Sequence, residues 1–158
     1  GRVVAADFVP EMLALGRHKA PGIRTLTADA LDLPFADATF DGVTIGFGVR
    51  NFSDIDAGLR EAARVLKPDA RLVVLDCSQP PFRPFRALYY FYFRHLLPRI
   101  GRLISRHADA YTYLPESVLA FPGAELLREH MEMAGLSDVR YRRLLFGVVA
   151  IHVGTRRA

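Results

Sequence analysis

The chain has 158 residues, about the size of one ordinary domain, and 51% of them are hydrophobic, enough to bury a substantial core. The net charge of +4 comes mainly from arginines spread along the chain, and no run of five like charges occurs, which argues against a nucleic-acid-binding tail. The single cysteine, Cys77, excludes an intramolecular disulfide framework and a zinc site built on several thiolates, and it suits a reducing cytoplasm.

The N-terminal residues suggest that more chain precedes them. Gly1 stands where a methionine would open a complete protein, and the apolar stretch 3–6 follows at once, so we expect residues upstream. The first residues lack the charged, apolar and small-residue order of a signal peptide.

The first half of the chain alternates predicted strands and helices. Strands are predicted at residues 3–6, 23–27, 40–47 and 71–77, and three of these runs are almost continuously apolar, as in a parallel sheet covered by helices. Helices are predicted at residues 10–20 and 54–66, the second capped by Asp54 and ended by Lys67-Pro68. This alternation predicts an α/β fold with right-handed crossovers.

The second half is more helical and ends in two strands. Residues 84–104 are aromatic, basic and helical in pattern, with a break at Pro98, and a further helix is predicted to start after residues 121–123 and to end at Gly135. Gly147 alone separates the last strands, 139–146 and 148–153, which predicts a tight antiparallel hairpin at a sheet edge. We expect one domain over residues 1–158, with residues 82–121 as a helical cap on its substrate side.

Ligands of open parallel sheets bind outside the carboxyl ends of the strands. Asp7 ends the first predicted strand, where it can accept hydrogen bonds from ribose hydroxyls or, alternatively, cap the next helix. After the second strand, Asp29 can accept from an exocyclic amine such as that of adenine, and Ala30 leaves room for a flat ring; Asp29 is equally plausible as a turn residue.

The loop Gly46-Phe47-Gly48-Val49-Arg50-Asn51 follows the third strand. Its glycines permit close approach of a ligand to the backbone, and Arg50 and Asn51 add a positive charge and an amide. A phosphate loop is disfavoured, because the third glycine and the Lys-Ser/Thr pair are absent and Asp54 would repel phosphate.

Histidines and the cysteine give weaker signals. None of the five histidines stands at metal-binding spacing from another ligand type, so we predict no metal site and favour structural or surface roles. No local base accompanies Cys77, which favours a small buried residue over a nucleophile.

Several short motifs carry a resemblance to a known family. They are Leu33-Pro34-Phe35 with Thr39-Phe40-Asp41, the loop Gly46–Asn51, and the stretches at residues 64–68, 97–101 and 113–117. The chain resembles the class I S-adenosylmethionine-dependent methyltransferases, and within them the C-methyltransferases of menaquinone and ubiquinone biosynthesis, which act on demethylmenaquinol and 2-polyprenyl-6-methoxy-1,4-benzoquinol. The resemblance implies a Rossmann-like three-layer sandwich with S-adenosylmethionine as cofactor.

The resemblance also implies roles for individual residues. Asp7 would bind the ribose hydroxyls of the cofactor, and Asp29 and Ala30 would lie beside its adenine. Arg50 and Asn51 would belong to the loop that faces the cofactor sulfonium and the quinol, with Gly46 binding the cofactor and Phe47, Arg50 and Asn51 binding the quinol.

The sequence departs from the family pattern at three places. Asp69-Ala70 replaces the usual Gly-Gly after Lys-Pro, and Asp76 replaces the usual Glu. The first strand and the glycine-rich loop of the family would precede Gly1, so the strands on either side of that place would either pair directly or accept a strand from a partner.

Methylation of a quinol carbon requires an electron-rich ring, which loss of a phenolic proton provides. Arg50 is our candidate for stabilising the phenolate, because its guanidinium remains charged and offers several donors. Water or a carboxylate, with Asp29 the nearest candidate, would accept the proton, and His107 and Tyr111 are weaker candidates near the quinol. Alternatively, Arg50 forms an ion pair with Asp54 that shapes the loop.

The segment 82–104 interleaves aromatic and aliphatic residues with arginines, which makes it too charged to span a bilayer. It suits a membrane interface or a groove for an isoprenoid tail, and equally a cap over the sheet or a homodimer contact. We therefore expect a lipophilic quinol substrate, a cytoplasmic protein with peripheral membrane contact, and no nucleic-acid partner. Methylation of another small acceptor, and a catalytically incomplete non-enzymatic fragment, are the alternatives.

Overall fold

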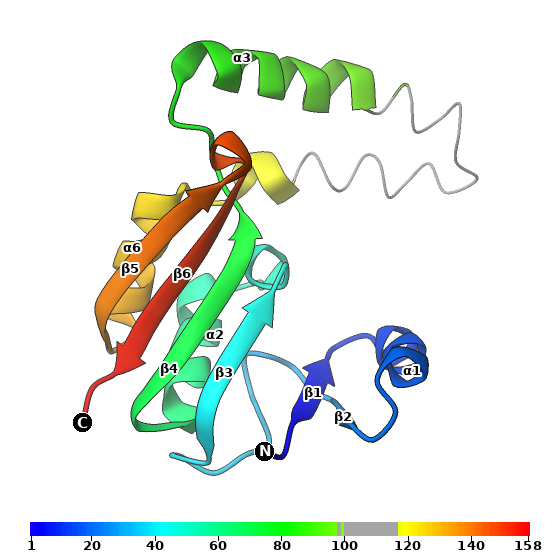
Figure 1. The fold of residues 1–158 in the computed structure, drawn as a ribbon, viewed down its shortest axis with the longest axis vertical. Helices are drawn as coiled ribbons and strands as arrows, with labels where there is room; N and C mark the ends of the chain where they lie inside the picture. The colour runs from blue at the N-terminus through cyan, green and yellow to red at the C-terminus, as the bar shows by residue number, and fades with distance from the viewer. Residues whose placement is uncertain (98, 100–116) are drawn as a thin grey trace.

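The computed structural model describes residues 1–97, 99 and 117–158 (Figure 1). The first half contains β1 (Val4–Asp7), α1 (Pro10–Lys19), β2 (Arg24–Thr27), β3 (Phe40–Gly46), the 3-10 helix η1 (Val49–Asn51), α2 (Ile55–Val65) and β4 (Leu66–Cys77). The second half contains α3 (Arg83–Phe91), the π-helix η2 (Tyr92–Leu96), α6 (Ala124–Met133), β5 (Leu136–Leu144), the 3-10 helix η3 (Leu145–Gly147) and β6 (Val149–Arg156). The predicted strands and the helices within the described residues are confirmed, whereas the break at Pro98 lies outside them.

The described strands form two sheets. β1 and β2 pair in parallel, and the other sheet has the order β3-β4-β6-β5, in which β3 and β4 are parallel and the remaining pairs antiparallel. The α/β class and the hairpin at a sheet edge are thus confirmed. Among the described strands β1 does not pair with β3, so the expectation of direct pairing between them is wrong.

The core lies between the larger sheet and the helices α2 and α6, which lie behind it in the view of Figure 1. Alternate residues of β4 point into this core, and Leu72 and Val74 are fully buried. Val73 and Leu75, which point to the other face of the sheet, are half-buried. The continuous apolar run of β4 is therefore fully buried on one face of the sheet and partly buried on the other.

Helix α2 begins and ends where local chemistry dictates. The side chain of Asp54 accepts a hydrogen bond from the backbone N–H of Ala57 at 2.9 Å, which satisfies one of the free donors of the first turn. The helix ends at Val65, before Lys67-Pro68, as predicted. Asp69 then adopts a positive φ of 62°, a conformation that glycine adopts more easily, at the position where the family pattern has Gly.

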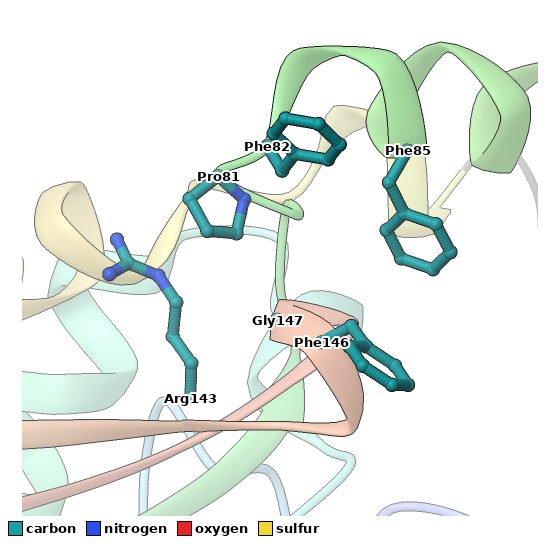
Figure 2. Close-up of a pocket in the computed structure, with 6 residues that line it drawn as sticks. All are labelled: Pro81, Phe82, Phe85, Arg143, Phe146 and Gly147. Carbon is teal, nitrogen blue, oxygen red and sulfur yellow. The ribbon is translucent and has the colours of Figure 1, made fainter.

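The hairpin between β5 and β6 turns through η3 next to the segment that follows β4 (Figure 2). Gly147 has a φ of +91°, and a Cβ atom there would lie 2.6 Å from Cδ of Pro81. Only glycine fits this conformation and this close approach, so the hairpin turn is held tightly against the Pro80-Pro81 corner.

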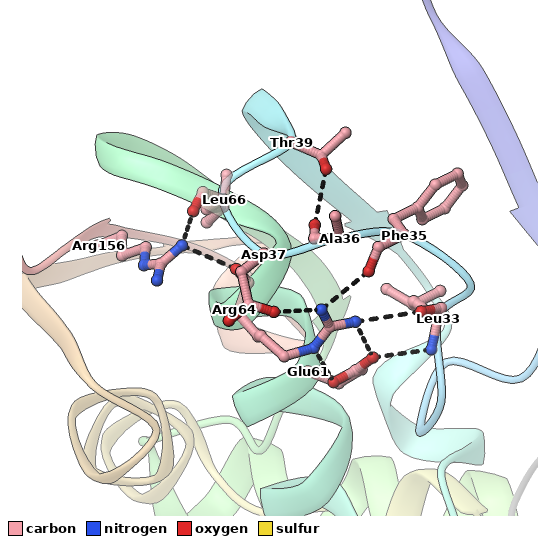
Figure 3. Close-up of polar contacts among 9 residues, drawn as sticks. All are labelled: Leu33, Phe35, Ala36, Asp37, Thr39, Glu61, Arg64, Leu66 and Arg156. Carbon is pink, nitrogen blue, oxygen red and sulfur yellow. Dashed lines mark hydrogen bonds and ion pairs between the residues drawn. The ribbon is translucent and has the colours of Figure 1, made fainter.

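Arg64 at the end of α2 ties the loop after β2 to the main body (Figure 3). Its guanidinium pairs with Glu61 and Asp37 and donates to the carbonyl oxygens of Leu33 and Phe35. The hydrogen bonds to Glu61 and then to Asp37, with the charges of both carboxylates, raise the pKa of Arg64. The motif at residues 33–35 thus provides backbone acceptors for a structural arginine.

Candidate functional site

The candidate site lies at the carboxyl ends of β3 and β4. The two strands run in parallel with Gly46 opposite Leu75, so the loop 46–51 lies beside the end of β4. The backbone N–H of Phe47 donates to the carbonyl oxygen of Leu75 at 2.7 Å, which continues the ladder one residue past the strand. This pairing sets where the next residues of the loop point.

Arg50 is fixed in this loop by a buried carboxylate. Its Nη1 lies 2.8 Å from Oδ1 of Asp76, and its backbone N–H donates to Oδ2 of Asp76 at 3.3 Å. The side chain of Asp76 is 0% exposed and that of Arg50 is 14% exposed. The N–H of Cys77 also donates to Oδ1 of Asp76 at 2.8 Å, so the carboxylate joins the loop after β3 to the end of β4.

The Arg50–Asp76 ion pair replaces the alternative in which Arg50 pairs with Asp54, and it adds Asp76 to the site. That alternative is wrong, because Asp54 caps α2 and Arg50 pairs with Asp76. Asp76 was not predicted as a site residue. The available signal was its place at the end of the strand adjacent to the loop.

Phe47 lies beside Arg50, as a shared role requires. The guanidinium carbon of Arg50 is 5.7 Å from the centroid of the exposed Phe47 ring, within cation–π range. Phe47 has a positive φ of 55°. Asn51 lies in the same short helix as Arg50, whereas His107 and Tyr111 lie outside the described residues.

The backbone at Gly46 leaves room at the strand end, because a Cβ atom there would have no heavy atom within 4 Å. A ligand can thus approach this part of the main chain without meeting a side chain.

Asp7 is the last residue of β1, and Asp29 lies two residues after the end of β2. Oδ1 of each accepts a backbone N–H two residues further on, from Val9 and Leu31 respectively, both at 2.9 Å. Val9, not Asp7, is the N-cap of α1, so the capping alternative for Asp7 is wrong. Asp29 does lie in a turn, and its side chain is exposed.

These carboxylates fit the groups of S-adenosylmethionine that they were predicted to bind. Each local hydrogen bond orients a carboxylate while leaving its second oxygen available for hydroxyl or amine donors. Ala30, beside Asp29, carries no side chain beyond its methyl group. Binding of the cofactor ribose by Asp7, and of its adenine by Asp29 and Ala30, stays a prediction.

Further polar atoms near the end of β4 are buried without a protein partner. Among the described residues these include Nε of Arg50, Oγ of Ser78 and the hydroxyl of Tyr89. Buried polar groups are almost always hydrogen-bonded, so these atoms have unused capacity for a ligand or for water. Burial raises the pKa of Tyr89, which keeps its hydroxyl protonated as a donor.

Cys77 and two of the described histidines have structural surroundings. Burial raises the pKa of Cys77 despite the nearby Arg50, so the thiol stays protonated. His130 pairs with Asp56, and His152 is buried against the carbonyl oxygen of Ala124. No group of three His, Cys, Asp or Glu residues in the described part of the chain is arranged to hold a metal ion.

Comparison with known proteins gives a consistent family. The ubiE/COQ5 methyltransferase family matches residues 1–156. Demethylmenaquinone methyltransferase of Thermus thermophilus is 54% identical over 158 residues, covering 98% of this chain and 71% of that protein. The protein of the same name from Deinococcus radiodurans is 51% identical over 98% of this chain, which covers 66% of its length.

Solved structures agree on the fold. An S-adenosylmethionine-dependent methyltransferase from Thermotoga maritima superposes with a TM-score of 0.68 at 18% identity, covering 98% of this chain and 73% of that one. The CurJ carbon methyltransferase gives a TM-score of 0.70 at 12% identity, covering 99% of this chain and 42% of that one. At such identities the likeness concerns the fold alone, and it confirms the Rossmann-like class. With the match over residues 1–156, the chain belongs to the ubiE/COQ5 methyltransferase family.

Proposed function

We propose that this chain provides the quinol side, and part of the cofactor side, of a site that transfers a methyl group from S-adenosylmethionine to a ring carbon of demethylmenaquinol. The observation that carries the proposal is the Arg50–Asp76 pair at the carboxyl ends of β3 and β4, within the loop that carries the family motif. The names of the relatives favour demethylmenaquinol over the benzoquinol as the acceptor.

When bound, S-adenosylmethionine supplies an electrophilic methyl group on a positively charged sulfur. The quinol must lose a phenolic proton, so that its ring carbon forms the new C–C bond while the C–S bond breaks. The ring proton at that carbon then leaves and aromaticity is restored. The protein has to align the two reactants and stabilise the phenolate, since both raise the rate without a covalent intermediate.

Arg50 stabilises the phenolate in this proposal. The carboxylate of Asp76 occupies Nη1, and Nε is buried without a partner, so the guanidinium is oriented before the substrate arrives and still has unused donor capacity. Phe47, packed against the guanidinium, offers an aromatic face to a quinol ring. Arg50 and Phe47 thus act together on the acceptor.

The proton acceptor is assigned less directly. Asp76 already accepts hydrogen bonds from Arg50 and Cys77, so we assign it to positioning Arg50. The role of Asp29 as the carboxylate that takes the proton, directly or through water, remains a prediction. It follows β2, in the other sheet from Arg50.

The acceptor is lipophilic, and we propose that the protein reaches it by peripheral contact with the membrane. No helix among the described residues is long and apolar enough to cross a bilayer.

The proposal is tested with the protein that carries this chain, incubated with methyl-labelled S-adenosylmethionine and an acceptor. We expect label in the ring of demethylmenaquinol and much less in small catechols or amines. Efficient transfer only to a small acceptor would replace the quinol in the proposal. Absence of transfer to every acceptor, from a folded protein that does not bind the cofactor, would support the non-enzymatic alternative.

A further inference from the structure

An apolar pocket lies between the β5–β6 hairpin turn and the start of α3 (Figure 2). Its volume is about 260 Å³, and it is lined by Pro81, Phe82, Phe85, Arg143, Phe146 and Gly147. The rings of Phe85 and Phe146 meet edge to face, with centroids 5.8 Å apart. This contact joins the hairpin turn to α3 across the pocket.

The rim of the pocket exposes large apolar side chains to solvent. Phe146 is 87% exposed, Leu145 is 71% exposed and Phe82 is 67% exposed. Leu145 and Phe146 also have positive φ values of 49° and 58°. The turn thus carries two bulky apolar residues in conformations that glycine or asparagine adopts at lower free energy, without burying them.

The apolar surface continues along α3. Phe85 and Leu88 of α3 and Tyr92, the first residue of η2, follow each other at spacings of three and four residues, so they line one side of the helix, and Leu88 is largely exposed. Tyr89, four residues after Phe85, lies on the adjoining side of the helix and is buried against Phe93. The helix is therefore anchored by one side while its apolar stripe faces outward.

The charges around this stripe have one sign. Arg143 lines the pocket, Arg83 and Arg86 follow Phe82 at the start of α3 and Arg94 belongs to η2, and none of them forms an ion pair with another residue that the structure describes. The sequence contains no Asp or Glu between Cys77 and Leu97. Exposed apolar side chains at the pocket rim, next to arginines without an ion pair, match the interface of an anionic bilayer, where acyl chains lie beneath phosphate groups.

We propose that the hairpin tip and the outer side of α3 dock on an anionic lipid bilayer. Phe82, Leu145 and Phe146 reach the acyl boundary, and Arg83 and Arg86 lie at the level of the phosphates. Pro81 of this surface lies four residues after Cys77, the last residue of β4, and Asp76 of the candidate site directly precedes Cys77. Docking therefore brings the candidate site close to the lipid phase. This deepens the proposed function, because a prenylated quinol dissolves in the bilayer, but docking itself requires neither quinol nor cofactor.

Vesicle co-sedimentation tests the docking surface directly. The protein that carries this chain is mixed with phosphatidylcholine vesicles that contain or lack phosphatidylglycerol, at low and at high salt. We expect binding only to the anionic vesicles, weakened by salt. The double variants Phe82→Ser/Phe146→Ser and Arg83→Glu/Arg86→Glu should each lower the partition coefficient by roughly tenfold or more.

Matched controls separate this surface from general stickiness. Phe8 is 72% exposed on the β1–α1 connection, and Arg60 is exposed on α2, so Phe8→Ser and Arg60→Glu should leave vesicle binding within about twofold. Circular dichroism checks that every variant is folded.

Several outcomes overturn the proposal. They are absence of binding to anionic vesicles by the folded wild-type protein, or equal losses in the control variants. A change of oligomeric state in the Phe82/Phe146 variant with vesicle binding unchanged would assign the surface to a second copy of the chain. Loss of quinol methylation in that variant with vesicle binding unchanged would assign the pocket to the prenyl tail. Failure of the methyl-transfer reaction alone would leave vesicle binding intact, so the two proposals fail separately.

Discussion

Asp76 and Arg50 form a buried ion pair, an arrangement whose desolvation often offsets its Coulomb attraction. Its value here is positional, because the same carboxylate holds both the side chain and the backbone N–H of Arg50. A guanidinium fixed in this way does not have to reorganise when negative charge develops on a bound quinol. The ion pair therefore connects the pairing of β3 with β4 to the proposed chemistry.

Substitution of Asp76 by Asn should show this coupling. The buried guanidinium of Arg50 would lose its counter-charge, so we expect the free energy of unfolding to fall by about 3 kcal/mol. Arg50→Gln alone should also destabilise, because it leaves Asp76 unpaired. Denaturant unfolding of both single variants and of the double variant measures the coupling. Additive effects of the two substitutions would show that the ion pair does not link them.

His152 gives the stability a predictable dependence on pH. Burial is the main cause that lowers the pKa of this histidine in the folded state, so the folded protein takes up its proton at a lower pH than the unfolded chain does. Above a pH of about 6.5 both states are neutral and this residue adds no pH dependence. As the pH falls below that value the unfolded state binds the proton first, and stability decreases until the folded-state pKa is reached.

We therefore expect His152→Gln to flatten the loss of stability between neutral and mildly acidic pH. Denaturant unfolding of wild type and variant at a series of pH values measures the difference. An unchanged slope in the His152 variant would contradict the assignment.

At the scale of elements, local signals in the sequence were sufficient for most boundaries. The apolar runs predicted the strands, and Asp54 and Lys67-Pro68 marked the ends of α2, because these signals act within a few residues. The early start of β4 at Leu66 was not predicted. In the sequence, Lys67-Pro68 indicates an interruption of regular structure. Leu66 starts a strand only because it pairs with Phe40, which is distant in the sequence.

Glycines within helices also show that the sequence alone does not reveal contacts between distant residues. Gly58 in α2 is required by its neighbour, because a Cβ atom there would lie 2.4 Å from Cδ2 of Phe52. Gly16 in α1 has no heavy atom within 4 Å of such a Cβ position. Both residues look alike in the sequence, and only the fold distinguishes them.

The two glycines make a matched pair of substitutions. Gly16→Ala should stabilise the protein by about 0.5–1 kcal/mol, since alanine is the better helix former. Gly58→Ala should destabilise it despite the same gain, because the Phe52 ring, next to Asn51 of the site loop, has to move. Thermal unfolding of both variants measures the contrast. A stabilising Gly58→Ala would show that Phe52 moves freely.

At the scale of the whole molecule, Arg64 joins parts that are far apart in the sequence. It holds the loop that leaves β2 and, through its own carbonyl oxygen, accepts a hydrogen bond from Arg156 at the end of β6 (Figure 3). The smaller sheet, with Asp7 and Asp29, is connected to the main body through that loop. Arg64 therefore helps to place the predicted cofactor carboxylates relative to Arg50.

Arg64→Ala should loosen this connection. We expect faster hydrogen exchange in β1, α1 and β2, with the exchange of α6 unchanged, and a lower midpoint of thermal unfolding. Arg128→Ala is the control, because Arg128 pairs with Glu125 and Glu132 within the surface of α6 alone. Equal exchange in the Arg64 variant and in wild type would contradict a linking role.

The candidate site was predictable in part. The rule that ligands bind at the carboxyl ends of parallel strands led to Asp7, Asp29 and the loop 46–51, and the structure brings Phe47 and Arg50 of that loop together, while their roles stay predictions. Asp76 was missed because its role depends on the pairing of β3 with β4. The predictions for His107 and Tyr111 concern positions outside the described residues.

The role of Arg50 towards the acceptor is tested most directly by the rate of methyl transfer in the double variant Arg50→Gln/Asp76→Asn. This variant removes both charges of the buried pair together. It is measured with demethylmenaquinol in the protein that carries this chain, alongside the affinity for S-adenosylmethionine by calorimetry. We predict a rate that is lower by roughly 10²–10³-fold, with cofactor affinity within a few-fold of wild type. An unchanged rate in the folded variant would contradict the assignment of Arg50 to the acceptor.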